Sequence, residues 1–262
     1  MRSGTDISAN IADMEGFIRE AASKGACYVQ TPEMTGILQK NTKALFASIV
    51  ADKDDPVFGK ASDLAQELGI WIHIGSTAVD RGDGKAANRA GLFSPNGERV
   101  ASYDKIHMFD VDLDNGESWR ESKVYHPGDK CVLAKMDDIS LGMAICYDMR
   151  FPHLFRAQAK KGAEILSCPA AFTRQTGEVH WHILLRSRAI ENGTFMIAAA
   201  QGGLHEDGRE TYGHSLVINP WGQIIGELDH DEPGVLIAEL DLSEVGKARS
   251  RIPSLANERQ FS

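Results

Sequence analysis

Apolar positions recur at helical spacing in some segments of the chain and at strand spacing in others. From Ile7 to Lys24 they recur every three or four residues, with Asp6 placed to cap the helix and Gly25 to end it. The same spacing predicts helices over 57–68, 154–161 and 178–191. Short apolar runs predict strands over 27–31, 70–77, 90–94, 100–103, 132–136, 139–145, 164–168, 195–200, 215–219, 223–228 and 235–240.

Turn residues join several of these strands into hairpins, and helices separate the others. Pro95-Asn96-Gly97-Glu98, Asp137-Asp138 and Pro220-Trp221-Gly222 each lie between two predicted strands. Helices that alternate with strands and hairpins predict a mixed sheet covered by helices, an α/β fold. We find no composition shift, internal repeat or low-complexity segment, so residues 1–262 are predicted to form one domain.

Cys146 is the strongest candidate for a reactive group. It ends the apolar run that starts at Ile139, and the polar cluster Tyr147-Asp148-Met149-Arg150 separates it from the helix predicted after Pro152. A strand, a sharp turn and a helix expose one nucleophile at the end of a sheet. A helix N-terminus also favours the thiolate, so we expect a lowered thiol pKa. A buried, inert cysteine is the alternative, but the polar neighbours disfavour it.

Two charged residues follow other predicted strands and suit a cysteine nucleophile. Glu33 comes after the strand at 27–31, and Lys105 comes after the strand at 100–103. A thiol that attacks a carbonyl or nitrile carbon needs a base and a positive group for the developing oxyanion. Ligands bind beyond the carboxyl ends of strands in α/β sheets, so three strand ends are predicted to meet there. Each charge alone is typical of a solvated loop.

Composition limits the possible partners and the compartment. The chain has 262 residues and a net charge of −9, which disfavours nucleic acid and anionic membranes as partners. No apolar run approaches the ~20 residues of a membrane helix. Four sparse cysteines without CxxC spacing indicate a reducing, cytoplasmic setting.

Three segments together resemble the signatures of the nitrilase (carbon–nitrogen hydrolase) superfamily. They are Thr31-Pro32-Glu33, the stretch 103–112 (YDKIHMFDVD) and the stretch 144–152 (AICYDMRFP). The resemblance runs from Ser3 to about Phe261. It implies a four-layer αββα sandwich with mixed sheets covered by helices, and a homodimer or higher homo-oligomer.

The resemblance also implies roles for individual residues. Glu33 would be the general base, Lys105 would stabilise the tetrahedral intermediate, and Cys146 would be the nucleophile. The family's additional active-site glutamate falls on Glu121, with Glu117 as a second choice. The backbone N–H of Tyr147 would join Lys105 in holding the oxyanion.

The implied activity is hydrolysis of a non-peptide carbon–nitrogen bond, with a small amide as substrate, through a thioester and without a metal or organic cofactor. The segments 176–181, 198–203 and 212–215 resemble the branch that hydrolyses deaminated glutathione and related ω-amides, with release of ammonia. The alternatives are a nitrilase, a carbamoyl-amide hydrolase, or a catalytically silent family member that acts as a binding protein.

Other features carry weaker expectations. The pair His180 and His182 is not expected to bind metal, because no acid has ligand spacing to it and residues two apart diverge on a helix. His107 is expected to serve packing or hydrogen bonding, and Gly213-His214-Ser215 to shape the pocket or a dimer contact. Family members open with an apolar strand for which this chain has only Met1-Arg2, so we expect the functional protein to start earlier.

Overall fold

The computed structural model describes residues 1–113, 116 and 118–260. Its α-helices are α1 (Ile7–Ser23), α2 (Thr42–Ser48), α3 (Pro56–Leu68), α4 (Pro152–Lys160), α5 (Arg174–Asn192) and α6 (Ser243–Arg251). Its strands are β1 (Tyr28–Gln30), β2 (Trp71–Asp80), β3 (Ala86–Phe93), β4 (Arg99–Asp104), β5 (Asp110–Asp112), β6 (Ser118–Arg120), β7 (Leu133–Met136), β8 (Ile139–Met143), β9 (Ile165–Ser167), β10 (Phe195–Ala198), β11 (Gly202–Leu204), β12 (Glu210–Tyr212), β13 (Leu216–Ile218) and β14 (Ile224–Glu227). Short 3-10 helices are η1 (Asp52–Asp54), η2 (Glu121–Lys123) and η3 (Cys146–Arg150).

Two mixed sheets form the centre of the molecule. One has the order β1-β2-β3-β4, and the other has the order β14-β13-β10-β9-β8-β7. The strand β1 is parallel to β2, while β3 is antiparallel to both of its neighbours. In the second sheet β8, β9 and β10 are parallel, and antiparallel strands extend both sides. Because two antiparallel steps separate β2 from β4, the edge strands β1 and β4 run in the same direction.

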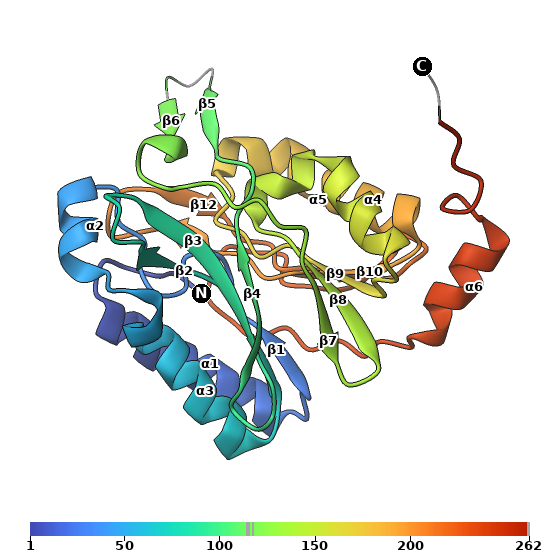
Figure 1. The fold of residues 1–262 in the computed structure, drawn as a ribbon, viewed down its shortest axis with the longest axis horizontal. Helices are drawn as coiled ribbons and strands as arrows, with labels where there is room; N and C mark the ends of the chain where they lie inside the picture. The colour runs from blue at the N-terminus through green and yellow to red at the C-terminus, as the bar shows by residue number, and fades with distance from the viewer. Residues whose placement is uncertain (114–115, 117, 261–262) are drawn as a thin grey trace.

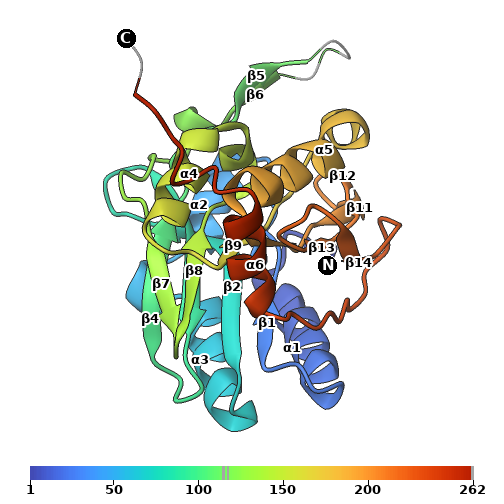
Figure 2. The same cartoon turned by 90° about the vertical axis from the view of Figure 1, so that its right-hand side faces the viewer.

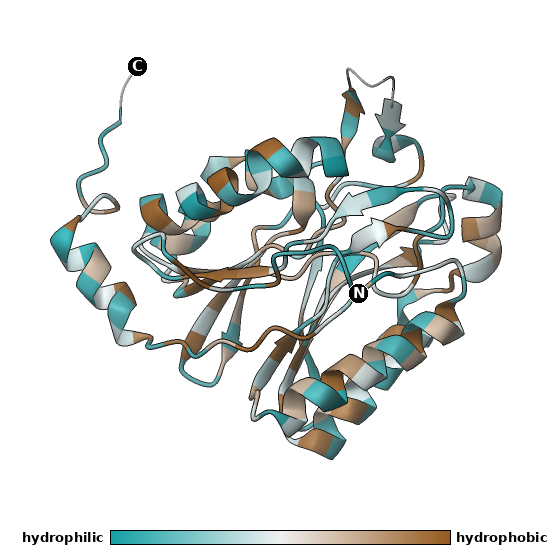
Figure 3. Cartoon of the chain, turned by 180° about the vertical axis from the view of Figure 1, so that it is seen from behind, coloured by the Kyte–Doolittle hydropathy of each residue, from teal (hydrophilic) through white to brown (hydrophobic). Residues whose placement is uncertain are grey.

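Helices cover the outer face of each sheet, which confirms the predicted αββα arrangement. Figure 1 shows α1 and α3 on one side, the two sheets in the middle, and α4 and α5 on the other side. Local signals fix these helices, since the Asp6 carboxylate caps α1 and Gly69, in the left-handed conformation, ends α3. Hydrophobic and hydrophilic residues share these helices, as expected for helices with one buried face (Figure 3).

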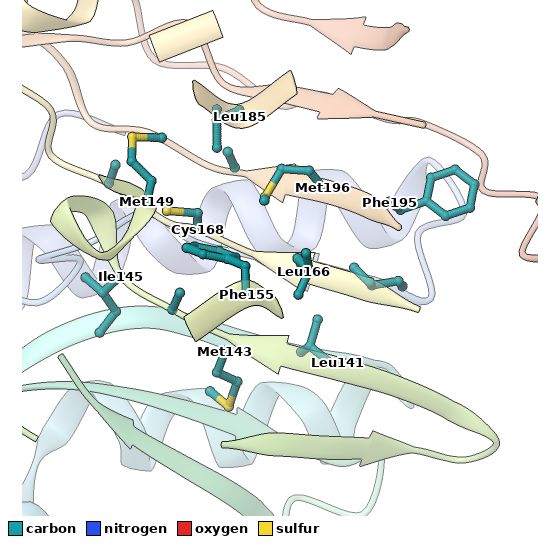
Figure 4. Close-up of a cluster of buried hydrophobic side chains, with 14 of the residues drawn as sticks. Leu141, Met143, Ile145, Met149, Phe155, Leu166, Cys168, Leu185, Phe195 and Met196 are labelled. Carbon is teal, nitrogen blue, oxygen red and sulfur yellow. The ribbon is translucent and has the colours of Figure 1, made fainter. Parts of the chain in front are cut away.

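The largest apolar cluster fills the space between the sheets and continues under α4 and α5. Leu92 and Tyr103 enter it from the first sheet, and Leu141 and Met143 from the second. Phe155 of α4 packs into it, among the side chains drawn in Figure 4. A second cluster joins α1 and α3 to the outer face of the first sheet. Side chains of the largest cluster therefore pack against both faces of β8, the strand that precedes Cys146, and fix where this strand ends.

The stretch Val235–Leu240 was predicted as a strand, and that prediction is wrong. The stretch is extended, and from Leu236 onward its side chains alternate between half-buried and exposed, but it forms no strand. Alternation reports which way side chains face, whereas a strand also needs a neighbouring backbone to bond. The helix α6 follows this stretch (Figure 2), and Arg249 ties it to the carbonyls of Ala163 and Asn192.

Several short elements lack a strong sequence signal and were not predicted. They are α2, α6 and the two-stranded ribbons β5–β6 and β11–β12. Within the described residues, β1 pairs only with β2 in its sheet. The expectation of an earlier strand beside it stays a prediction. In the same described part of the chain, we find no helix that combines the length and apolar character needed to cross a bilayer.

Candidate active site

Glu33, Lys105 and Cys146 meet in one place, each just after the end of a strand. Glu33 follows β1, Lys105 directly follows β4, and Cys146 follows β8 in the facing sheet. All three are buried, with exposed fractions of 3%, 2% and 7%. The prediction that three strand ends would bring these side chains together is therefore met by the geometry.

A glycine in β2 lets the loops that carry these residues approach one another. A Cβ atom at Gly75 would collide with the Thr31 carbonyl oxygen and with the side chain of Pro169. Pro169 in turn accepts a hydrogen bond from the Cys146 N–H at 2.9 Å. Any side chain at position 75 would thus push the Glu33 loop and the Cys146 turn apart.

Cys146 occupies a strained turn that a buried carboxylate fixes in place. Its φ is 48°, in the left-handed region that residues other than glycine seldom adopt. Asp148, fully buried, accepts hydrogen bonds from the Ile145 N–H at 2.9 Å and from the Tyr103 hydroxyl at 2.6 Å. It also bonds the backbone and side chain of His107, which has the hydrogen-bonding role predicted for it. One carboxylate thus couples the cysteine turn to the Lys105 segment.

Lys105 lies between two carboxylates. Its Nζ is 2.9 Å from Glu33 Oε1 and 2.9 Å from Glu121 Oε2. Asn88 of β3 donates from its Nδ2 to Glu33 Oε1 at 2.9 Å and to Glu121 Oε1 at 3.3 Å. Two backbone N–H groups complete the network, from Ala171 to Glu33 Oε2 at 2.7 Å and from Phe109 to Glu121 Oε2 at 2.7 Å. The cation and both carboxylates are therefore oriented before any substrate binds.

These contacts set the charge states of Glu33 and Lys105. Together with Cys146, these two residues are called the triad below. Burial alone would raise the pKa of Glu33, but Lys105 and the bonds from Lys105 and Ala171 hold that pKa below its usual value of 4.5. Burial would lower the pKa of Lys105, but Glu121 and Glu33 raise it well above 10.5. Glu33 is thus an anion and Lys105 a cation at neutral pH.

The Cys146 thiol behaves differently from the expectation. Burial, and next the Glu33 carboxylate, raise its pKa well above 9.0, although Lys105 opposes them. The favourable helix terminus is only the five-residue η3, and α4 starts later, at Pro152. Desolvation therefore outweighs the helix dipole, and the expected lowering of the thiol pKa is wrong. A protonated thiol beside an ionised carboxylate needs a base during its reaction, and Glu33 is placed to supply one.

Tyr147 presents a backbone donor beside the thiol. Within the described part of the chain its N–H has no acceptor. Its ring contacts Phe109 and Phe151 edge-on, with centroids 5.1 and 5.4 Å away. The rings hold the peptide group in place, so this N–H is free to bond an oxygen bound next to Cys146.

A cavity of about 300 Å³ opens above the four groups Glu33, Lys105, Glu121 and Cys146. Its walls come from α2, from the β5–β6 ribbon, from the segment at 171–176 and from Arg209, which precedes β12. The β5–β6 ribbon and the turn between β11 and β12, neither of which was predicted, therefore contribute to the cavity. This volume suits a small molecule.

The residues that sequence reasoning missed are the ones that orient the triad. Asn88 and the Ala171 N–H bond Glu33 from segments with no distinctive motif, so no local signal marks them. Glu121 lies where the family resemblance implied, bonded to Lys105. The second choice, Glu117, lies outside the described residues.

His182 has partners that its sequence neighbours did not indicate. Its Nε2 lies 2.6 Å from Glu227 Oε1 of β14, and His214 Nδ1 lies 3.9 Å from the same oxygen. Sequence spacing did not indicate this acid, because the sheet brings Glu227 to α5 from a distant part of the sequence. His180 instead faces Arg150, with its Nδ1 3.3 Å from Nη2. Trp181 donates to the His214 carbonyl at 2.8 Å, so this segment fixes α5 against the second sheet.

Comparison with known proteins identifies the family. The family profile described as Carbon-nitrogen hydrolase matches residues 1–250. The deaminated glutathione amidase of Yersinia enterocolitica is 39% identical over 99% of this chain and 91% of its own length. The human omega-amidase is 33% identical over 96% of this chain and 90% of its own length.

Solved structures support the same family assignment. The NitFhit protein of C. elegans superimposes with a TM-score of 0.90 and 33% identity, over 99% of this chain and 63% of that longer chain. The amidase from Nesterenkonia sp. AN1, solved with the acetamide moiety of fluoroacetamide bound covalently at its active site cysteine, gives a TM-score of 0.82 with 26% identity. It covers 99% of this chain and 91% of that one. On these matches the chain belongs to the carbon–nitrogen hydrolase family.

Proposed function

We propose that this protein is an amidase that hydrolyses a small linear amide through a thioester on Cys146. One observation carries the proposal. The buried Cys146 thiol, on a strained turn, lies beside the ionised Glu33 carboxylate and the Lys105 ammonium, which pairs with two carboxylates. These groups line a cavity of about 300 Å³. These are the nucleophile, the base and the oxyanion donor that acyl transfer requires. The amidase names of relatives 33–39% identical support an amide as substrate.

In the first half of the reaction, Glu33 takes the thiol proton as the Cys146 sulfur bonds to the amide carbon. Charge develops on the amide oxygen, which Lys105 and the Tyr147 N–H stabilise. When Lys105 turns toward this oxygen, Glu33 loses part of the contact that lowers its pKa and becomes a better base. The protonated Glu33 then gives its proton to the nitrogen of the leaving ammonia or amine, and the carbon–nitrogen bond breaks.

In the second half, water attacks the thioester carbon and Glu33 takes one of its protons. The carbon–sulfur bond breaks, the carboxylic acid leaves, and the thiol recovers its proton. Glu121 orients Lys105 throughout, because both of its carboxylate oxygens accept hydrogen bonds from the ammonium. These residues supply every proton transfer, so the proposed chemistry calls for neither a metal nor an organic cofactor.

For the substrate we propose an ω-amide of an α-keto acid or deaminated glutathione itself. The support for this choice is that the relatives are a deaminated glutathione amidase and an omega-amidase. We expect kcat/KM for α-ketoglutaramate and for deaminated glutathione to exceed that for an aliphatic nitrile of similar size. Ammonia or amine release measured on the three compounds tests this. A nitrile preferred over both amides would assign the protein to a nitrilase instead, and no turnover of any of them would favour a binding role.

We further propose that residues 1–262 act as one catalytic domain, that the protein is a homodimer, and that it works in the cytoplasm. The four cysteines are free, which suits a reducing compartment. For the dimer, α5 carries a stripe of exposed apolar side chains at Val179, Ile183 and Ile190, with exposed fractions of 57%, 66% and 53%. Their spacing puts them on one face of the helix, which is typical of a surface that a partner covers.

This stripe gives a test of the dimer. Ile183→Glu puts a charge in the middle of the stripe, so we expect the protein to shift from dimer to monomer in light scattering after gel filtration. Val100→Glu is the control, since Val100 is 45% exposed on β4 in the other sheet, and it should leave the mass unchanged. A wild-type protein that is already monomeric, or an Ile183→Glu variant that stays dimeric, would contradict this interface.

A further inference from the structure

The cavity has a cationic wall in a protein that is acidic overall. The chain carries a net charge of −9, yet the charged residues that line the cavity are two acids and five bases. The acids are Glu33 and Glu121, and both bond Lys105. The other bases are Lys40, Arg120, Lys123 and Arg209. A local excess of positive charge around a cavity attracts anionic ligands.

Of the two arginines in the wall, Arg209 is the one with unused hydrogen-bonding capacity among the described residues. Arg120 bonds the Asp112 carboxylate and the carbonyls of Val111 and Trp119, so its guanidinium is occupied. Among the described residues, the Arg209 guanidinium donates one hydrogen bond, at 3.4 Å from Nη2 to the Asp207 carboxylate, with which it forms an ion pair. Its buried Nε has no hydrogen-bond partner among the described residues. A buried N–H without a partner is costly, so such a group in a cavity wall is suited to a ligand that accepts a bond.

Arg209 packs against an aromatic ring of the cavity wall. Its guanidinium lies 4.8 Å from the centroid of the Trp119 ring, and Lys40 Nζ lies 6.0 Å from the same ring. An aromatic ring beside a guanidinium helps to hold it in place through a cation–π interaction, and the N–H groups of a guanidinium can bind a carboxylate with two hydrogen bonds. Lys40 adds a second positive charge near the same ring.

We infer that Arg209 binds a carboxylate of the substrate that is remote from the scissile amide, and that it thereby selects anionic amides over neutral ones. The inference rests on the amidase function proposed above. It assigns to the Arg209 guanidinium the recognition of negative charge on the substrate. Lys105 does not serve this purpose, since Glu33 and Glu121 hold it at the reacting end. Arg209 is a specificity residue, so its loss should affect charged substrates only.

The test compares two isosteric substrates that differ in charge, glutaramate and its neutral diamide, glutaramide. We expect the wild-type protein to prefer glutaramate. Arg209→Gln should lower kcat/KM for glutaramate by about 50-fold, mostly through KM, as expected for the loss of a charge-assisted contact. It should change kcat/KM for glutaramide less than about 3-fold. Arg209→Lys should keep part of the preference. The control is Arg259→Gln, which removes the same charge from an exposed site outside the cavity.

A binding measurement separates this inference from the proposed function. Titration calorimetry with glutarate, which needs no turnover, should show binding to the wild-type protein and a loss of about 50-fold in affinity in Arg209→Gln. If neither amide is hydrolysed but glutarate binding depends on Arg209, the amidase proposal fails, whereas the carboxylate-binding role of Arg209 stands. If both substrates lose equally in Arg209→Gln, or if glutarate binds the variant as well as the wild type, the inference is overturned. If the variant does not fold, a wild-type protein that prefers glutaramide overturns it as well.

Discussion

Replacing Cys146 by alanine is expected to abolish amide hydrolysis while leaving the fold intact. The proposed reaction has no route that avoids the carbon–sulfur bond, so kcat should fall by about 10⁴-fold or more. Alanine also has a Cβ, so it adopts the left-handed backbone at this position about as well as cysteine does. Loss of one buried sulfur costs about 1 kcal/mol, which lowers the melting temperature by roughly 2–4 °C in a protein of this size.

Two measurements check this expectation. Ammonia release is compared between the wild type, Cys146→Ala and Cys131→Ala, whose half-buried thiol lies outside the cavity and should be dispensable. Intact-protein mass spectrometry during turnover should show an acyl adduct on the wild type and none on Cys146→Ala. A purified Cys146→Ala protein that retains a few per cent of the wild-type rate would remove Cys146 from the nucleophile role.

The sequence was sufficient to predict the meeting of Glu33, Lys105 and Cys146, because each is tied to a strand end. Apolar runs locate the strands, and because β1 and β4 run in the same direction, Glu33 and Lys105 lie at the same end of their sheet. Cys146 follows β8 in the facing sheet, and the rule for a single sheet does not cover its position. The same logic predicted the helices that cover the sheets, where capping residues such as Asp6 and Gly69 mark the ends. These predictions therefore used the local pattern of apolar and capping residues together with one rule of sheet geometry.

Tertiary environment decided the points that sequence could not reach. The lowered thiol pKa expected for Cys146 was wrong because burial depends on how the two sheets enclose the turn. The contact of His182 with Glu227 joins residues 45 positions apart, through β14, and no spacing rule covers it. Asn88 and Arg209 likewise acquire their roles from the segments they face. Short ribbons such as β5–β6 are too brief to give a periodic signal, yet they place Trp119 in the cavity wall.

The second large effect is expected at Lys105, where one side chain serves both catalysis and stability. Lys105→Met keeps the length and the apolar stem but removes the charge. Loss of an oxyanion donor costs about 10²–10³-fold in kcat. Loss of the cation that lowers the pKa of Glu33 should reduce kcat further. The variant also leaves two buried carboxylates without their cation, which typically costs about 3–5 kcal/mol in unfolding free energy. Lys24→Met is the control, since Lys24 pairs with Glu20 at 2.6 Å on the surface and should cost less than about 0.5 kcal/mol.

The pH dependence of stability distinguishes this explanation from a general packing defect. In the wild type the pKa of Glu33 is held below 4.5, so this group stabilises the fold above that pH and its contribution is lost as the pH falls. In Lys105→Met the cation that lowers the pKa of Glu33 is gone, so burial raises that pKa above its value in the unfolded chain. Protonation of Glu33 then favours the folded state at low pH, and this benefit disappears as the pH rises. The difference in melting temperature between wild type and variant should therefore be small near pH 5 and large near pH 8, whereas a packing defect would give the same difference at both.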